Sequence, residues 1–348
     1  MKKKALVAGA LGITGRNLVK HLSGLEDWGV VALSRRAPEF KTRVPFLSVD
    51  LLSRSDCDEK LRALSDVTHV FFAAYTERQT EAEQVIANLA LLRNLTETIE
   101  SVAPIERMVL VEGAKYYGAH LGPYKTPAKE SDPRHMPPNF YYDQEDYLIE
   151  KAAEGRWTWA ALRPSGICGF AVGNPMNISM VLAVYATISK ELKLPLRFPG
   201  RPGAYRAIAE MTDAEHLARA MVWAATDEKC ANEAFNITNG DYFRWENLWP
   251  RIAESFGMAY GPPLQLPLTT FMRDKGTLWE RMVQTYGLRP YRFEEIAAWG
   301  FGDALFNIEY DVMSDTGKAR RLGFCDAVDT EEMFGRLIRQ FRADRIIP

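Results

Sequence analysis

Three glycines close to the start of the chain have the spacing of a phosphate-binding turn. Gly9, Gly12 and Gly15 directly follow the apolar run Ala5–Val7 and precede a segment with helical periodicity. In this setting the first glycine permits a tight turn, the second lets backbone amides approach a pyrophosphate, and the third allows close packing of helix on sheet. The free N–H groups of the helix N-terminus then favour an anion. The pattern predicts a dinucleotide site rather than a purely structural turn.

Two arginines indicate which nicotinamide cofactor the site selects. A site for NAD has a carboxylate at the end of the second strand, where it binds the ribose 2′-hydroxyl. This chain has Ser34, Arg35 and Arg36 there. Guanidinium groups suit a 2′-phosphate, because they combine charge with bidentate hydrogen bonds. We therefore expect NADP(H), with a solvated basic turn as the alternative. Asp50 and Leu51 follow the third strand, where an adenine edge would lie.

A tyrosine is the usual proton or hydrogen-bond donor of a short-chain reductase with such a domain. The pattern Tyr-x-x-x-Lys occurs once, at Tyr147 and Lys151. Tyr147 lies only 16 residues before Arg163, too few for a helix across the sheet and the strand that Arg163 ends, whereas Tyr141 lies 22 before it. Tyr147 would lie ~9 Å further down the helix, on another face. We predict Tyr141 as the functional tyrosine and Tyr147 with Lys151 as ordinary helix surface.

Tyr141 has no lysine four residues later, because Glu145 stands there. Free tyrosine has a pKa of ~10, so a useful acid needs a cation nearby to stabilise its phenolate. Lys115 follows the fifth expected strand by a few residues, in a segment without the Ser or Thr that short-chain enzymes normally have at that strand end. We therefore predict that Lys115 provides the cation for Tyr141.

The elements that must position these residues alternate between short apolar runs and helical patterns. Such alternation predicts an α/β fold: a parallel, doubly wound sheet of Rossmann type with helices on both faces. The expected strands are Ala5–Val7, Val30–Leu33, Phe46–Val49, Val67–Ala74, Arg107–Val111, Thr158–Leu162 and Ala234–Ile237. Helices are expected around Leu18–Leu22, Cys57–Leu64, Val85–Ile99, Gln144–Ala153, Val181–Glu191 and Ala214–Ala225.

The segment Gly113–Asn139 interrupts this alternation. It holds five prolines and three glycines, which indicates a long loop, and long loops in a compact domain are usually functional or disordered. The final part of the chain, rich in Trp, Phe and Pro, predicts a smaller and mostly helical lobe. We expect an NADP-binding Rossmann domain over residues 1–170, with returning segments near 205–240 and 303–325, and a mainly substrate-binding lobe over residues 171–348.

The composition is that of an ordinary globular enzyme. The 348 residues are 47% hydrophobic and 25% charged, with a net charge of −2, so the basic surface of a nucleic-acid binder is not expected. Four dispersed cysteines without a Cys-x-x-Cys pair suit a reducing compartment, and no metal site is expected. The glycines and Arg16 at the start argue against a secretion signal. Without an apolar run of about eighteen residues, we expect no membrane span and a cytoplasmic protein.

Five collinear segments carry a resemblance to a known family. They are Gly113–Tyr117 (GAKYY), Asn139–Asp146 (NFYYDQED), Arg163–Phe170, Asn232–Asp241 and Trp299–Asp303. The second matches the NFYYxxED motif, and the first resembles the TGxKHY segment, of the progesterone 5β-reductase and iridoid synthase-like (PRISE) enone reductases, atypical members of the extended short-chain dehydrogenases/reductases. The resemblance covers nearly the whole chain.

The resemblance implies a reaction. Tyr141 and Lys115 match the family's catalytic residues, and NADPH would deliver hydride to the β-carbon of a small hydrophobic α,β-unsaturated carbonyl compound. Tyr141 would hydrogen-bond the carbonyl oxygen, while Lys115 would hold the cofactor ribose and stabilise the charge that develops. Tyr142 is expected to be a packing neighbour. Phe301 matches an aromatic residue of the substrate pocket, with a place in the plain core as its alternative.

The resemblance also implies cofactor contacts and shows departures from the family. The implied contacts are Gly12, Ile13, Arg35, Arg36, Asp50, Leu51, Ala74, Tyr75, Ile167, Asn174, Pro175 and Met176. Glu112 replaces a threonine, Ala119–Leu121 is an insertion, and Ala74 with Tyr75 replaces a Thr-Trp pair. Because these differences border the pocket, the resemblance indicates the type of reaction more strongly than the substrate. It does not imply a steroid.

Two other kinds of function stay open at this point. One is another short-chain reaction, a 1,2-reduction of a ketone or a nucleotide-sugar epimerase/dehydratase-like reaction, against which the absence of Tyr-x-x-x-Lys at the right depth counts. The other is a non-catalytic protein that senses NADP without turnover, against which Tyr141 and Lys115 argue. The sequence does not fix the natural substrate, the stereochemistry or the oligomeric state, and a homodimer is compatible with it.

Overall fold

The chain forms two compact units. The computed structural model describes residues 2–38, 40 and 42–348. Unit 1 comprises Met1–Pro164, Ala214–Ile237 and Asp315–Asp326. Unit 2 comprises Ser165–Asp213, Thr238–Ser314 and Ala327–Pro348.

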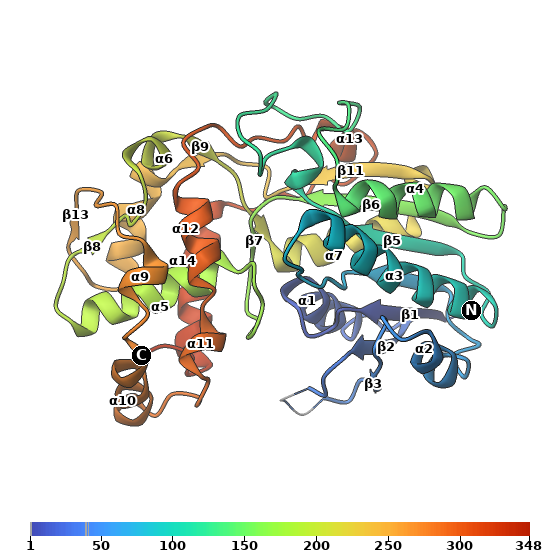
Figure 1. Ribbon diagram of the computed structural model, residues 1–348, viewed down its shortest axis with the longest axis horizontal. Coiled ribbons are helices and arrows are strands. Elements are labelled where there is room, and N and C mark those ends of the chain that lie inside the picture. Colours follow the sequence, from blue (N-terminus) through green and yellow to red (C-terminus); the bar gives the residue numbers. More distant parts are fainter. Residues whose placement is uncertain (1, 39, 41) are drawn as a thin grey trace. The chain divides into compact units, whose positions relative to one another are not determined.

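A seven-stranded sheet forms the centre of unit 1, in the order β11-β6-β5-β4-β1-β2-β3 with every pair parallel (Figure 1). This is the doubly wound Rossmann arrangement expected from the sequence. The chain builds outward from β1 to β3, then returns to the other side of β1 with β4, so the order reverses between β1 and β4. The strands are β1 (Lys3–Ala8), β2 (Trp28–Ser34), β3 (Phe46–Ser48), β4 (His69–Phe72), β5 (Arg107–Val111), β6 (Thr158–Pro164) and β11 (Glu233–Ile237).

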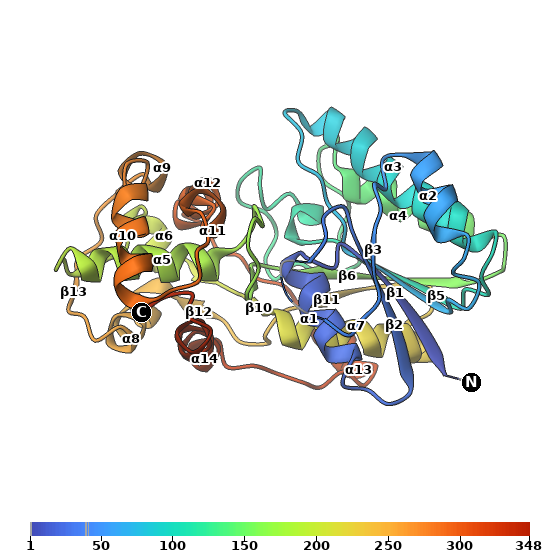
Figure 2. The ribbon, with the colours of Figure 1, turned by 90° about the horizontal axis from the view of Figure 1, so that it is seen from below.

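Helices cover both faces of this sheet, which explains why its central strands are apolar throughout. Figure 2 shows α2, α3 and α4 on one face and α1 with α7 on the other. The helices are α1 (Ile13–Leu22), α2 (Arg54–Leu61), α3 (Glu81–Glu100), α4 (Phe140–Ala152), α7 (Ala214–Thr226) and α13 (Gly317–Arg321), with the 3-10 turns η1 (Ala114–Tyr117) and η2 (Glu228–Cys230).

Helix α4 begins four residues earlier than the sequence indicates. We expected a helix from Gln144, but the Asn139 side chain accepts a hydrogen bond from the Tyr141 amide at 3.1 Å and starts the helix at Phe140. Asparagine is a favoured N-cap residue. The apolar periodicity missed the first turn, because its aromatic residues have no helical apolar period, whereas the spacing argument already placed Tyr141 on this helix above Tyr147. As a result, Tyr141 lies in the first turn of α4.

Unit 2 is mostly helical, as expected. An aromatic core that includes Phe198, Trp245, Trp249 and Phe306 is buried within it. Its helices are α5 (Ile178–Glu191), α6 (Pro202–Arg206), α8 (Trp245–Ser255), α9 (Leu268–Phe271), α10 (Gly276–Tyr286), α11 (Phe293–Ile296), α12 (Trp299–Phe306) and α14 (Thr330–Ala343). Three short two-stranded sheets pair β7 (Ile167–Cys168) with β10 (Thr212–Asp213), β9 (Ile208–Ala209) with β12 (Phe243–Arg244), and β8 (Leu196–Arg197) with β13 (Tyr260–Gly261).

Two segments expected to return to the Rossmann domain lie partly in unit 2. Residues 205–213, 238–240 and 303–314 belong to unit 2, whereas residues 214–237 and 315–325 belong to unit 1. Local bonds explain this, because Thr212 pairs with Ile167 in a short sheet and the buried Glu210 carboxyl accepts from the Ser314 amide and hydroxyl at 2.8 and 2.7 Å. Among the described residues, no helix is both long and apolar enough to cross a membrane.

Candidate active site

The glycine turn between β1 and α1 has no room for side chains. Gly9 has a φ of +80°, and a Cβ atom there would lie 2.5 Å from the Ala73 carbonyl oxygen. A Cβ atom on Gly15 would lie 2.3 Å from the Gly9 carbonyl oxygen. Gly12 is the N-cap of α1, no side chain caps it, and the first turn has no acidic residue. The α1 N-terminus, which continues with Ile13, is therefore a backbone cradle with the chemistry of a pyrophosphate site.

The arginines at the end of β2 are suited to a phosphate. Arg35 and Arg36 are both exposed, and within the described part of the chain neither guanidinium makes a hydrogen bond or an ion pair. The Ser48 hydroxyl donates to the Arg35 carbonyl oxygen at 2.9 Å and holds the turn beside Ser34, the last residue of β2. Two free cations here fit the 2′-phosphate of NADP. That they bind it stays a prediction.

The predicted cofactor contacts that follow β3 and β4 already make hydrogen bonds with neighbouring residues of the chain. One Asp50 oxygen accepts from the Leu52 amide at 3.0 Å, and the carbonyl of the buried Leu51 accepts from the Asn94 side chain at 2.8 Å. After β4, the half-buried Tyr75 donates from its hydroxyl to Gln84 at 2.9 Å, next to the half-buried Ala74. These residues lie at the carboxyl ends of the strands, and their contacts with a cofactor stay predictions.

Tyr141 points from α4 to the carboxyl ends of β5 and β6. A Cβ atom on Gly113 would lie 3.2 Å from the Tyr141 hydroxyl oxygen and 3.4 Å from the Pro164 carbonyl oxygen. Gly113 directly follows Glu112 at the end of β5, and Pro164 ends β6. No described residue makes a hydrogen bond with the Tyr141 hydroxyl. The phenol is therefore able to donate a hydrogen bond to a ligand at this edge of the sheet.

The surroundings of Tyr141 keep its phenol protonated. Burial raises the pKa of Tyr141 above its usual range, and the negative charge of Glu112 raises it further. Since both influences disfavour a phenolate, the side chain stays a hydrogen-bond donor over the ordinary pH range.

Lys115 lies in η1, and Asn139, the N-cap residue of α4, holds this turn. The Asn139 side-chain amide donates to the Lys115 carbonyl oxygen at 2.9 Å, so one residue fixes both segments. Among the described residues, the Lys115 ammonium makes no hydrogen bond or ion pair, including none with the Tyr141 hydroxyl. Partial desolvation lowers the pKa of His120, and the charge of Lys115 lowers it further. The expected pairing of Lys115 with Tyr141 stays a prediction.

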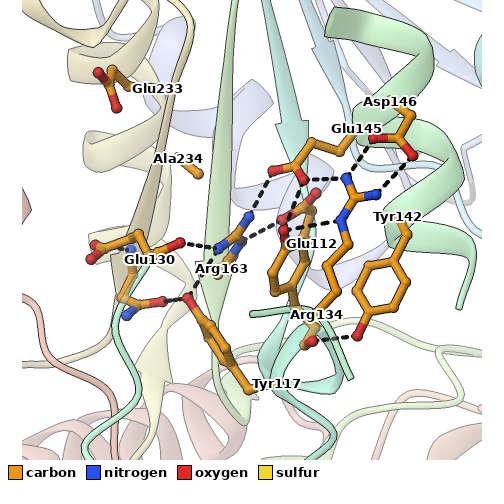
Figure 3. A network of polar contacts seen from close by, with 12 residues as sticks. Glu112, Tyr117, Glu130, Arg134, Tyr142, Glu145, Asp146, Arg163, Glu233 and Ala234 are labelled. Carbon is orange, nitrogen blue, oxygen red and sulfur yellow. Dashed lines mark hydrogen bonds and ion pairs between the residues drawn. The ribbon is translucent and has the colours of Figure 1, made fainter. Parts of the chain in front are cut away.

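Figure 3 shows a network of charged side chains from β5, β6, the long loop and α4. Glu112, Glu145 and Arg163 are buried in it, whereas Asp146 is exposed. Arg163 at the end of β6 donates to Glu112 at 2.7 Å and to Glu145 of α4 at 2.6 Å. Arg134 of the long loop donates to Glu145 at 2.8 Å and to both oxygens of Asp146 at 2.7 and 2.6 Å. Ion pairs with this many charge-assisted hydrogen bonds fix geometry. They tie β5, β6, the loop and α4 together around Tyr141.

Aromatic side chains complete this network. The Tyr116 hydroxyl donates to Glu145 at 2.9 Å, and the Arg163 guanidinium stacks 3.3 Å from the centre of the Tyr116 ring. The Tyr142 hydroxyl donates to the Tyr116 carbonyl oxygen at 2.6 Å, and its ring packs edge-on against Tyr116. Tyr142 is thus a packing residue, as expected. Tyr117 donates to Asn236 at 2.6 Å and anchors η1 to β11.

Tyr147 and Lys151 have a different environment from the one expected. We predicted ordinary helix surface, but Tyr147 is buried in the apolar core beneath α3 and α4, with the Arg93 guanidinium 5.5 Å from its ring centre. Lys151 forms an ion pair with Glu100 of α3 at 2.9 Å. The expectation of surface was wrong, because α3 covers this face of α4. Both residues hold the two helices together.

The remaining predicted site residues belong to unit 2. Ile167 lies in β7 and is partly buried. In the turn Asn174–Met176, the Asn174 side chain accepts from the Met176 amide at 2.9 Å. Phe301 lies in α12, partly buried and packed against the aromatic core of this unit. The cofactor contacts of Ile167 and of the turn, and the place of Phe301 in a substrate pocket, stay predictions.

The sequence analysis did not find the charge network. It treated Glu112 only as a departure from the family and assigned no role to Arg134 or to Glu145. The available signal was the Glu-Asp pair that ends the NFYYDQED motif, because acidic residues at α4 require basic partners if they are buried. Within the described residues, no group of three or more His, Cys, Asp or Glu side chains could hold a metal ion.

Comparison with solved structures shows the fold. The UDP-glucose 4-epimerase of Thermotoga maritima with UDP-glucose matches with a TM-score of 0.70 at 18% identity, covering 98% of this chain and 99% of that chain. The Thermus thermophilus UDP-glucose 4-epimerase in complex with NAD matches with a TM-score of 0.67 at 20% identity, covering 97% and 99%. These are extended short-chain enzymes with the same sheet.

Comparison with sequences shows the family. An (S)-8-oxocitronellyl enol synthase of Nepeta racemosa is 35% identical, over 99% of this chain and 91% of its own. The 3-oxo-Δ4,5-steroid 5β-reductase of Arabidopsis thaliana is 35% identical over 99% and 93%, and a short chain dehydrogenase of Penicillium aethiopicum is 32% identical over the full length of both. The model of the PRISE-like Rossmann-fold domain matches residues 44–348. The chain therefore belongs to the PRISE-like family of Rossmann-fold proteins.

Proposed function

We propose that this protein is an NADPH-dependent reductase of the activated C=C bond in α,β-unsaturated carbonyl compounds. The observation that carries the proposal is the Tyr141 hydroxyl at the carboxyl ends of β5 and β6, for which the described residues provide no hydrogen-bond partner. It lies at the sheet edge where Rossmann domains bind their ligands. Relatives over nearly the full length include a steroid 5β-reductase and (S)-8-oxocitronellyl enol synthases.

Tyr141 has the properties that a 1,4-reduction requires. When bound, NADPH supplies a hydride to the β-carbon of the conjugated carbonyl compound, which leaves an enolate. The Tyr141 phenol donates a hydrogen bond to the carbonyl oxygen, where negative charge develops. Its raised pKa keeps the proton on the phenol, so the residue acts by stabilising this charge and not as a phenolate.

Lys115 completes the catalytic pair in this proposal. Its ammonium is free of partners among the described residues, so it is available to the ribose hydroxyls of the cofactor. From there it adds positive charge to the hydrogen-bond network around Tyr141. The bond from Asn139 to the Lys115 carbonyl holds this segment at the N-terminus of α4.

The cofactor is NADP(H) in this proposal, although solved structures of similar fold contain NAD. The glycine cradle of α1 binds the pyrophosphate, and Arg35 with Arg36 binds the 2′-phosphate. Arg35 and Arg36 are exposed and have no partner among the described residues, which supports NADP, because a 2′-phosphate would pair with both. The substrate is a small apolar enone.

Reduction of 2-cyclohexenone with NADPH tests the proposal. Formation of the saturated ketone, with stoichiometric loss of NADPH absorbance, is the expected result. Formation of the allylic alcohol would replace the proposal by a 1,2-carbonyl reductase. Tight NADPH binding without oxidation, across a panel of cyclic and acyclic enones and enals, would favour a cofactor-sensing protein.

A further inference from the structure

The carboxyl group of Glu112 is buried and only half satisfied. Its side chain is 0% exposed, and its Oε2 accepts from Arg163 Nε at 2.7 Å. Its Oε1 has no hydrogen-bond partner within the described residues. A buried carboxylate with an unpaired oxygen carries a large desolvation cost, which protonation of the carboxyl removes.

The network around Glu112 contains more acidic than basic groups. Two guanidiniums, Arg163 and Arg134, face the three carboxyl groups of Glu112, Glu145 and Asp146. Both oxygens of Glu145 and both of Asp146 accept hydrogen bonds from these arginines or from Tyr116. Two of the three carboxylates are thus fully paired, and the third is the one with the unpaired oxygen. Because the Asp146 side chain is 54% exposed and solvent stabilises its charge, the unpaired oxygen of the buried Glu112, and not the number of charges, favours protonation of Glu112.

Glu112 is also coupled to the functional phenol. It is joined by a peptide bond to Gly113, whose Cα position borders the Tyr141 hydroxyl. Its negative charge is the largest charge effect on Tyr141, where it raises the pKa and opposes negative charge at the phenol oxygen. The same field opposes negative charge on a carbonyl oxygen that Tyr141 binds.

We propose that Glu112 is a positioning residue that acts through Tyr141 and must be uncharged for efficient hydride transfer. As a neutral acid it leaves the phenol free to stabilise the developing enolate. As a carboxylate it opposes that charge and slows the reaction. This inference rests on the proposed enone reduction and deepens it, because a buried carboxyl next to Gly113 then sets the working pH.

The groups around Glu112 determine the pH at which its carboxyl loses the proton. Burial raises its pKa to about 7, with the negative charge of Glu145 adding to burial while Arg163 and Arg134 oppose them. The phenols of Tyr116 and Tyr117 in η1 also face the network, and the Glu130 carboxyl of the loop accepts from the Asn236 amide. Since the neutral form is the active one, the rate is high below about pH 7 and falls above it.

The pH profile of single-turnover hydride transfer tests the inference. Wild type should lose about tenfold in rate between about pH 6 and about pH 8.5, or about 1.4 kcal/mol. Glu112→Gln, which is neutral at every pH, should keep the low-pH rate throughout. Glu130→Gln removes a nearby carboxyl that does not adjoin Gly113 and should retain the wild-type fall. A flat wild-type profile, or an equal fall in E112Q, would overturn the inference.

Infrared spectroscopy of the protein without substrate gives a second readout. The wild-type spectrum should lose a carboxylic acid C=O band between about pH 5.5 and about pH 8.5, and E112Q should lack that part of the change. Glu210, whose pKa burial also raises to about 7, should still titrate in E112Q and serve as an internal standard. If E112Q fails to fold, Glu112→Thr replaces it in both measurements.

The outcomes separate this inference from the proposed function. If no enone is reduced at any pH, the proposed function fails, and the inference with it. If enones are reduced but the E112Q and wild-type infrared changes are identical, Glu112 does not titrate and only the inference fails. An infrared change assigned to Glu112 together with a pH-independent rate also overturns it.

Discussion

Tyr141 and Tyr147 lie on the same helix but in opposite surroundings. Among the described residues neither hydroxyl has a hydrogen-bond partner, but that of Tyr141 borders Gly113 at the sheet edge. The ring of Tyr147 is packed in the core, 5.5 Å from the Arg93 guanidinium. The residue spacing from Arg163 selected Tyr141, whereas the Tyr-x-x-x-Lys pattern alone would have selected Tyr147. The spacing argument depends on where α4 and β6 can lie, and its choice of Tyr141 stays a prediction.

Replacing each tyrosine by phenylalanine tests this distinction. Tyr141→Phe should lower kcat for enone reduction by about 10²-fold or more, because it removes the donor to the enolate oxygen. Its affinity for NADPH, measured by fluorescence titration, should stay close to wild type. Tyr147→Phe keeps the packed ring and should leave kcat nearly unchanged. The opposite pattern would transfer the catalytic role to Tyr147.

The arginines after β2 give a second prediction at this scale. Arg35→Ala combined with Arg36→Ala should weaken NADPH binding by about tenfold or more, because two charge-assisted contacts to the 2′-phosphate are lost. Binding of NADH, which lacks this phosphate, should change much less. Calorimetric titration with both cofactors measures the difference. Equal weakening of the two would mean that the arginines do not bind the phosphate.

At the scale of elements, α4 and η1 form one supporting unit for the site. Asn139 caps α4 through its oxygen and holds η1 through its side-chain amide. The alternation of strands and helices was predictable, since buried parallel strands are short apolar runs. The apolar periodicity did not give the start of α4, because a single cap residue decides it, although the spacing from Arg163 placed Tyr141 on this helix. The turn η1 was also not predictable inside a segment rich in proline and glycine.

Gly113 precedes η1 and borders the Tyr141 hydroxyl of α4. Its φ of 177° is extended, so another residue can adopt this backbone, but a Cβ atom would lie 3.2 Å from the Tyr141 hydroxyl. Gly113→Ala should therefore shift the phenol and lower kcat by about tenfold, with little change in melting temperature. Gly24→Ala, where the nearest atom would be at 3.4 Å, is the control. Unchanged kcat in G113A would show that the phenol position is not critical.

At the scale of the whole molecule, the charge network joins segments far apart in the sequence. Glu112, Arg134, Glu145 and Arg163 come from β5, the loop, α4 and β6. Sequence periodicity predicts that these elements exist, but pairing of their charges depends on strand register and on the path of a 27-residue segment (113–139). The glycine turn, by contrast, was predictable because its whole geometry is local. The glycine turn could therefore be predicted from the sequence, whereas the ion pairs between distant segments could be found only in the structure.

The raised pKa of Glu112 also predicts how stability depends on pH. Folding raises this pKa from 4.5 to about 7, so the folded state holds the proton more tightly than the unfolded chain. The resulting stabilisation is fully present below about pH 4.5 and is lost as the pH rises through about 7.

Urea unfolding at about pH 5 and about pH 8 measures this linkage. Glu112→Gln should lose less unfolding free energy than wild type over this interval, whereas Glu228→Gln, at an exposed position, should match wild type. Comparison with E112Q is required because Glu210 titrates in the same range and remains in both proteins. Equal losses in wild type and E112Q would mean that Glu112 keeps one charge state throughout. The pH dependence of catalysis would then need a different group, since the proposal assigns the changes in stability and in rate to the same proton on Glu112.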